Sequence, residues 1–279
     1  MANFYQLLES RWRQGHFISV GLDSDYAKLP ECIKTSSITE TIFNFNKTII
    51  EATAEYCCVF KPNSAFYEGY GLEGLKALME TNRYIREHYP EIPIILDAKR
   101  ADIGNTNSGY VKAAFDIYLA HAITVHPYLG QEALKPFLEN KEWGVLVLCH
   151  TSNPGAGEFQ ELKSGGQEIY KIVASQVSQV WNENQNCGLV VGATYPAQLA
   201  EVRRIAPDLP LLIPGIGAQG GDLAQTVNLG LNSRGNGIII NSSRNIIYAS
   251  GDSDFGEAAK KEASKLDQAI FQFIPEQFK

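Results

Sequence analysis

The sequence predicts an α/β protein that folds as a single-domain (β/α)8 TIM barrel with an extra N-terminal helix. Short apolar runs alternate with longer amphipathic segments along all 279 residues. Each run is rich in Val, Ile or Leu and lacks period-2 polarity, as expected of parallel strands buried on both faces. The eight expected strands are Phe17–Leu22, Cys57–Phe60, Ile92–Leu96, Ala122–Val125, Gly144–Cys149, Gly188–Gly192, Leu209–Ile213 and Gly237–Ile240.

The segments between these runs have the patterns of helices. The segment before the first strand should cover the N-terminal end of the barrel. Ser37-Ile-Thr-Glu40 has the form of a capping box that opens a helix running toward Tyr56. Further helices are expected at Gly71–Tyr89, Gly166–Asn184, Pro196–Ile205 and Asp254–Phe273.

Eight βα units in one run favour a closed barrel over an open doubly wound sheet, which uses about five to seven strands and remains the alternative. The chain shows no internal repeat and no linker rich in Pro, Gly or Ser. Residues 1–279 are therefore expected to form one catalytic domain.

Composition excludes several classes of protein. The formal net charge of -7 argues against a general nucleic-acid-binding or membrane-binding surface. The N-terminal residues lack the apolar core of a signal peptide, and five cysteines without CxxC spacing are typical of a reducing compartment, so a cytoplasmic protein is expected. The five histidines show no spacing typical of a metal site.

The strongest functional signal follows the third expected strand. Function in such barrels lies where strands end and βα loops begin, and this position reads Asp97-Ala-Lys99-Arg-Ala-Asp102-Ile-Gly-Asn-Thr106. In extended chain, Asp97 and Lys99 point to the same side, and each favours the charged form of the other. Asp102 lies five residues beyond Asp97, so it need not share that pocket within one subunit.

Two further charged residues strengthen this signal. Asp23 and Lys61 each follow a neighbouring expected strand, so their side chains should approach the same mouth of the barrel. The alternative is that Asp-x-Lys is only a structural ion pair at the barrel rim. The additional Asp and Thr in the motif favour a catalytic site.

A phosphate site is expected after strands seven and eight, where barrels often bind phosphate. The first loop, Pro214–Gly221, contains glycines that let the backbone approach an anion closely. The second, Asn241–Arg244, supplies a guanidinium able to contact two phosphate oxygens. A glycine-rich turn alone is weak support, but its pairing with Arg244 favours phosphate.

These residues together resemble one family, the orotidine 5'-phosphate decarboxylases. The segment Asp97–Thr106 is similar to that family's signature, and the match to the longer bacterial branch extends to three further segments. These segments are Thr151-Ser-Asn-Pro-Gly155, Pro214–Gly221 and Asn241–Arg244. One departure is that the Gly-Arg of the family's eighth strand is Ser243-Arg244 here.

The resemblance implies catalytic roles for four residues. Lys99 would protonate C6 of the pyrimidine as CO2 departs. Asp97 would face the scissile carboxylate, and Lys61 would hold Asp97 in an alternating charge network. Asp102, together with Thr106, would reach into the neighbouring subunit's site, so that a homodimer with shared active sites is implied.

The resemblance also implies the contacts with substrate, orotidine 5'-monophosphate. Asp23 would bind the ribose hydroxyls, with Asn63 as a further ribose contact, and Ser152 would bind the pyrimidine amide. Pro214 is placed among the substrate-binding residues of the seventh loop. The phosphate would be bound by Gln219 and Arg244.

No metal and no cofactor are expected. Most decarboxylases stabilise the developing carbanion with an electron sink, and the sequence shows no motif for one, so fixed charge around Lys99 must do so. Two alternatives remain open. The same Asp-x-Lys-x-x-Asp frame could hold Mg²⁺ in a related barrel that acts on a sugar phosphate, or the chain could be a non-catalytic nucleotide sensor.

Overall fold

The computed structural model describes residues 2–217 and 220–278. Its main sheet has eight parallel strands in the order β2-β1-β10-β9-β8-β5-β4-β3. Isolated parallel bridges join the two outer strands, Phe60 to Ile94 and Asn63 to Asp97, so the sheet closes into a barrel. The predicted (β/α)8 barrel is therefore confirmed, and the open doubly wound sheet is excluded.

The barrel strands are short and almost wholly buried. Every residue of β1, β2, β4, β8 and β9 is buried, which explains why these strands consist of continuous apolar runs. The eight strands are β1 Ile18–Gly21, β2 Cys57–Lys61, β3 Ile95–Arg100, β4 Ala122–Val125, β5 Gly144–His150, β8 Cys187–Val191, β9 Leu211–Ile213 and β10 Ile238–Ser242.

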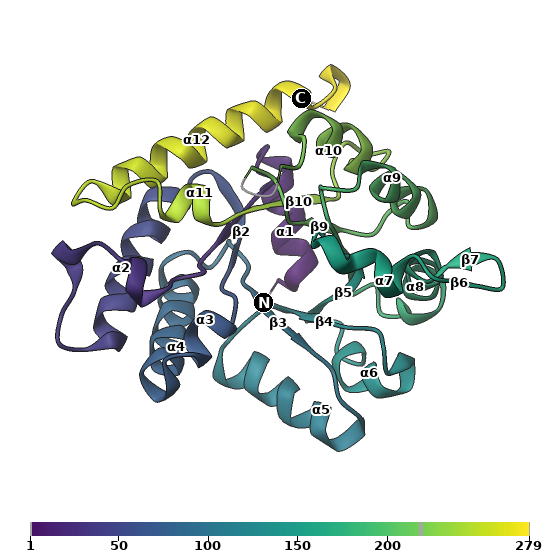
Figure 1. Cartoon of the computed structure of the whole chain (residues 1–279), viewed down its shortest axis with the longest axis horizontal. Coiled ribbons are helices and arrows are strands. Elements are labelled where there is room, and N and C mark those ends of the chain that lie inside the picture. Colours follow the sequence, from purple (N-terminus) through teal and green to yellow (C-terminus); the bar gives the residue numbers. More distant parts are fainter. Residues whose placement is uncertain (1, 218–219, 279) are drawn as a thin grey trace.

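Helices surround this barrel on the outside (Figure 1). The longer ones present apolar faces to the strands and form one hydrophobic cluster with them. The helices are α2 Ile38–Thr53, α3 Ala65–Glu68, α4 Gly71–His88, α5 Gly104–Val111, α6 Gly130–Leu138, α7 Gly157–Gln160, α8 Ile169–Gln176, α9 Pro196–Ile205, α10 Leu223–Gly230, α11 Arg244–Ile247 and α12 Phe255–Phe273. Two π-helical segments, 112–117 and 177–181, continue α5 and α8.

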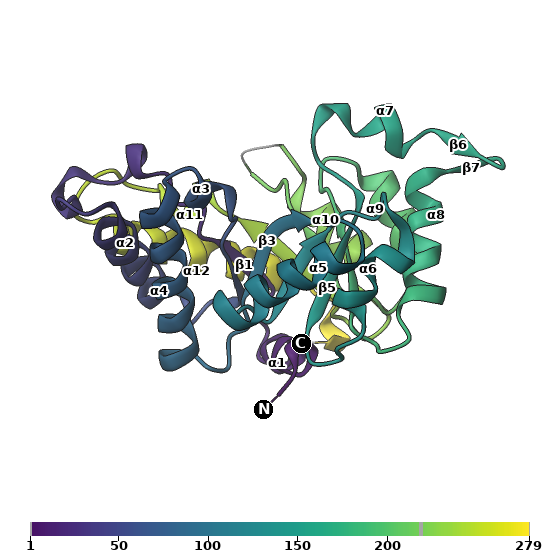
Figure 2. The same ribbon diagram turned by 90° about the horizontal axis from the view of Figure 1, so that it is seen from below.

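The extra N-terminal helix, α1 (Phe4–Arg13), lies where it was expected. The backbone N–H of Phe4 donates to the carbonyl of Glu142, just before β5. The indole N–H of Trp12 donates to the carbonyl of Ile238, the first residue of β10. Helix α1 therefore covers the N-terminal ends of the strands, and α7 lies at the opposite end of the molecule (Figure 2).

Several predicted boundaries were wrong. β3 runs to Arg100 and β10 to Ser242, so their polar ends belong to the strands rather than to the following loops. The helix expected at Gly166–Asn184 begins only at Ile169, because a small antiparallel hairpin precedes it, β6 (Lys163–Ser164) and β7 (Gln167–Glu168). Gly165 and Gly166 form its turn with φ of 59° and 85°, which only glycine adopts readily.

Ser37 caps α2, and its hydroxyl accepts a hydrogen bond from the backbone N–H of Glu40 at 3.2 Å. The predicted capping box is only half formed, because the N–H of Ser37 donates to the hydroxyl of Thr35 rather than to the side chain of Glu40. Among the described residues, no helix combines the length and the hydropathy that crossing a bilayer requires.

Candidate active site

A cavity of about 630 Å³ opens at the C-terminal ends of the barrel strands. Most of its lining comes from the last residues of strands and the loops that follow them, the position where function was expected. The lining residues are Asp23, Lys61, Asn63, Phe66, Asp97, Lys99, Leu148, Thr151, Ser152, Asn153, Gln160, Val190, Leu212, Pro214, Gly215, Ile216, Asn241, Ser242, Ser243, Arg244 and Asn245.

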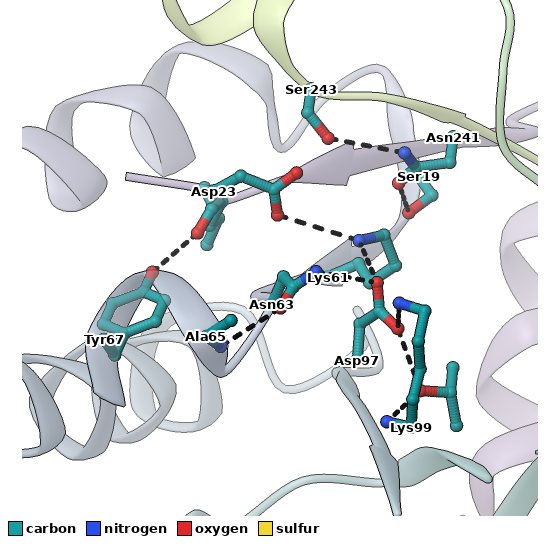
Figure 3. Close-up of polar contacts among 12 residues, drawn as sticks. Ser19, Asp23, Lys61, Asn63, Ala65, Tyr67, Asp97, Lys99, Asn241 and Ser243 are labelled. Atoms are coloured by element: carbon teal, nitrogen blue, oxygen red, sulfur yellow. Dashed lines mark hydrogen bonds and ion pairs between the residues drawn. The ribbon is translucent and has the colours of Figure 1, made fainter. Parts of the chain in front are cut away.

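Four charged residues form a chain of alternating sign along one wall of this cavity (Figure 3). The amine of Lys99 is 2.6 Å from Oδ1 of Asp97, and the amine of Lys61 is 3.0 Å from Oδ2 of the same carboxylate. Lys61 also lies 3.8 Å from Oδ1 of Asp23. The predicted same-side arrangement of Asp97 and Lys99 is thus present, and both carboxylate oxygens of Asp97 contact a cation.

Burial and charge act in opposite directions on these groups. Burial alone would raise the pKa of Asp97, but the two lysines outweigh it and hold that pKa well below its usual range. Burial alone would lower the pKa of Lys61, but Asp23 and Asp97 outweigh it and raise that pKa. Both groups are therefore charged at neutral pH, and they form a fixed electrostatic field in the cavity.

Lys99 differs from Lys61 in its access to the cavity. Its side chain is 47% exposed, whereas that of Lys61 is 4% exposed. Lys99 also has a φ of 46°, in the left-handed region that residues other than glycine rarely adopt. Of the two amines that bind Asp97, only that of Lys99 can meet a ligand over much of its surface.

Asp23 and Asn63 lie beside this charged wall. Oδ1 of Asp23 is buried and faces the Lys61 amine at 3.8 Å, without a hydrogen-bond donor at closer range among the described residues. Asp23 also lines the cavity, so its carboxylate can meet a ligand there. The side-chain amide of Asn63 donates to Oδ2 of Asp97 at 3.4 Å. Ser152 and Pro214 line the opposite part of the cavity, after β5 and β9.

Arg244, which follows β10, supplies positive charge to the same cavity. Its exposed guanidinium has no carboxylate partner within residues 2–217 and 220–278, unlike Lys61 and Lys99. The neighbouring Gly217 has a φ of 74°, in the left-handed region that favours glycine, and a Cβ there would displace the side-chain amide of Asn245. Ser243 has a φ of -117°, outside the left-handed region that favours glycine, so serine can occupy the position where the resemblance led us to expect glycine.

The comparisons with known proteins agree with this geometry. Residues 18–261 match the model of the orotidine 5'-phosphate decarboxylase / HUMPS family. The chain belongs to this family. It is 46% identical to an orotidine 5'-phosphate decarboxylase from Ralstonia pickettii over 274 residues, which are 97% of this chain and 98% of the relative. It is 48% identical to the protein of the same name from Bordetella avium, over 96% of this chain and 98% of that one.

Solved structures of the family confirm the fold. The chain superposes on Leishmania donovani OMP decarboxylase with a TM-score of 0.83 and 38% identity, covering 97% of this chain and 99% of that one. It superposes on Leishmania donovani UMP synthase with a TM-score of 0.88 and 39% identity, covering 98% of this chain. The match spans 57% of the UMP synthase chain, which is therefore a longer protein.

Two described residues of the family pattern are not in the cavity lining. Asp102 and Thr106 lie on the segment that leaves β3 and enters α5, and neither lines the cavity. Oδ1 of Asp102 accepts the N–H of Ile103 at 2.6 Å, and Thr106 is exposed. Gln219, the expected phosphate ligand, lies outside the described residues.

Sequence reasoning missed Thr124 of β4. Its hydroxyl donates to Oδ1 of Asp97 at 2.9 Å and accepts the backbone N–H of Lys99 at 3.0 Å. It also missed Gln160 of α7, which lines the cavity and accepts the N–H of Thr151 at 2.8 Å. The one signal for Thr124 was a polar residue within an otherwise apolar strand, Ala-Ile-Thr-Val.

Proposed function

We propose that this chain converts orotidine 5'-monophosphate into uridine 5'-monophosphate and CO2, without metal or cofactor. The observation on which the proposal rests is the juxtaposition of two features in one cavity. An alternating array of Lys61, Asp97 and Lys99 lines one wall, and the guanidinium of Arg244, which has no carboxylate partner among the described residues, lines the same cavity. Such a site can bind a phosphate while it acts on a second, charged group of the same molecule.

The substrate is placed by its polar groups. Its phosphate binds Arg244 and, in our proposal, Gln219. Its ribose hydroxyls donate to the carboxylate of Asp23, with Asn63 beside them. The pyrimidine amide then contacts Ser152, Pro214 borders the bound nucleotide, and C6 with its carboxylate faces the amine of Lys99.

The reaction is one bond cleavage and one protonation. The bond between C6 and the carboxylate breaks, CO2 leaves, and the electron pair of that bond remains on C6. The ammonium of Lys99 stabilises this charge and transfers a proton to C6, and the resulting amine regains a proton from solvent. The negative charge of Asp97, held by Lys61, opposes the substrate carboxylate but not the neutral CO2, so the step is favoured.

We also propose that the enzyme acts as a cytoplasmic homodimer, with Asp102 and Thr106 completing the partner's site. Exposed apolar residues on the loops after β3 and β4 support a subunit interface next to Asp102. Ile103, next to Asp102, is 63% exposed, and Tyr128 of the neighbouring loop after β4 is 89% exposed. The loops lie side by side, since the N–H of His126 donates to the carbonyl of Arg100. Exposed apolar residues gathered in this way are typical of protein interfaces.

The function is tested by following the loss of orotate absorbance with purified protein and orotidine 5'-monophosphate. We expect complete conversion with one CO2 released per nucleotide, at a rate that a chelator does not change. A folded preparation that binds the nucleotide without turnover would identify a sensor. Activity that requires added Mg²⁺ would identify the sugar-phosphate type of barrel and contradict the proposal.

Shared sites predict that two inactive variants complement each other. Lys99→Ala and Asp102→Ala should each have little activity alone. After subunit exchange at equal concentrations, half of the dimers are mixed and each mixed dimer has one intact site, so about a quarter of wild-type activity should return. If Asp102 serves its own subunit, both sites of a mixed dimer stay defective. No recovery despite exchange demonstrated by mass spectrometry would contradict the shared site.

A further inference from the structure

Strand β3 leaves the regular ladder with β4 at the charged wall of the cavity. Leu96 pairs with Ile123, and the pairing resumes at Arg100 with Val125. Between these pairs, β3 contains Asp97, Ala98 and Lys99, whereas β4 contains only Thr124. The extra residues form a bulge, and bulges commonly re-aim a side chain beside an active site.

Because of the bulge, the backbone N–H of Lys99 has no carbonyl partner in the β3–β4 ladder. A buried N–H without an acceptor is costly, so each one needs a partner. The N–H of Asp97 donates to the carbonyl of Pro62, toward β2, at 2.9 Å. The N–H of Lys99 instead donates to the side-chain hydroxyl of Thr124 at 3.0 Å, so this hydroxyl replaces a ladder carbonyl.

The hydroxyl of Thr124 is also linked, through Asp97, to the side-chain amine of Lys99. Since it accepts from the Lys99 N–H, its own proton is free to donate to Oδ1 of Asp97, 2.9 Å away. That oxygen also accepts from the Lys99 amine at 2.6 Å. The contacts form a closed ring that runs from the Lys99 backbone through Thr124 and Asp97 to the Lys99 amine. Thr124 is fully buried, and its branched side chain is restricted in χ1, so the ring is rigid at this point.

We propose that Thr124 is a positioning residue, whose hydroxyl holds Lys99 in its left-handed backbone conformation and holds the Lys99 amine against Asp97. The inference rests on the proposed function, because it gives Lys99 the role of proton donor. Thr124 does not line the cavity, so it acts through Lys99 and Asp97 and not by contact with substrate.

Thr124→Val tests this directly, because valine keeps the shape of threonine and lacks the hydroxyl. We expect kcat to fall by about 10- to 100-fold, the effect of a small misplacement of a reacting group. The KM for orotidine 5'-monophosphate and the Kd of uridine 5'-monophosphate should each change by less than about threefold, since Arg244 and Asp23 are unchanged. Thr124→Ser retains the hydroxyl and should retain most of the wild-type kcat.

Thr53→Val is the matched control. Thr53 is also fully buried and hydrogen-bonded, but its partner is the carbonyl of Ile49 within α2. This variant should lower thermal stability without lowering kcat. Should Thr124→Val fail to fold, Thr124→Ala compared with Thr124→Ser separates the hydroxyl from the methyl group in the same way.

A crystal structure of unliganded Thr124→Val provides a readout that does not depend on turnover. We expect Lys99 to leave the left-handed region or its amine to move out of hydrogen-bond distance of Asp97. Unchanged geometry, a wild-type kcat in Thr124→Val, or an equal loss in Thr124→Ser would each overturn the inference. An inactive wild-type protein would instead contradict the proposed function, while the crystal structure would still decide the role of Thr124.

Discussion

Lys99→Ala should lower kcat by at least about 10⁴-fold, because the change removes the proposed proton donor and a charge next to the carbanion expected to develop at C6. Uridine 5'-monophosphate should still bind within about tenfold of its wild-type Kd, since the phosphate and ribose contacts are elsewhere in the cavity. Single-turnover kinetics measures the first effect and calorimetric titration the second.

The fold should tolerate this substitution. Asp97 keeps Lys61 at 3.0 Å, so its buried carboxylate does not lose all compensating charge. Lys260→Ala is a suitable control, because Lys260 is exposed on α12, outside the cavity lining. A Lys99→Ala enzyme that kept more than a tenth of the wild-type kcat, or lost affinity alone, would show that another group supplies the proton.

Arg244→Ala should lower kcat/KM by about 10²- to 10³-fold, mainly through a higher KM. A guanidinium that binds phosphate through charge-assisted hydrogen bonds contributes roughly 3–4 kcal/mol when both prongs are used. In wild-type protein, inorganic phosphate should compete with the nucleotide, and this competition should weaken in the variant. Steady-state kinetics at several phosphate concentrations measures both effects.

Arg234→Ala provides the comparison for this prediction. Arg234 is exposed and precedes β10, whereas Arg244 follows it, so the two arginines lie at opposite ends of one strand. Its loss should leave KM unchanged. If Arg244→Ala reduced kcat with an unchanged KM, Arg244 would act on the reacting end of the substrate, and the phosphate would have to bind elsewhere.

The barrel could be predicted because its strands are buried on both faces, so each one is a continuous apolar run. The same rule misplaced the end of β3. Asp97 and Lys99 interrupt the apolar run, but β3 continues through a bulge to Arg100, because these side chains line a polar cavity rather than the core. The hairpin of β6 and β7 was missed because strands of two residues have no period to detect.

The candidate site was predictable where the chemistry depends on residue type. At the mouth of a barrel, a lysine close to an aspartate predicts a charged catalytic site, and an arginine after a glycine-rich loop predicts a phosphate site. Thr124 could not be found in this way, since one threonine in a buried strand is common and its role depends on the bulge opposite it. Asp102 and Thr106 could not be placed with the cavity, because their proposed target lies in a second chain.

The charge network also connects two strands of the barrel, β2 and β3. These two strands meet through isolated bridges at Phe60 and Asn63 rather than through a continuous ladder. Lys61 belongs to β2 and Asp97 to β3, so their ion pair crosses this junction, which lacks a continuous ladder. A change that loosened this pair would weaken the wall beside the proposed nucleotide site, so the same ion pair contributes to closure of the barrel and to the alignment of the proposed catalytic groups.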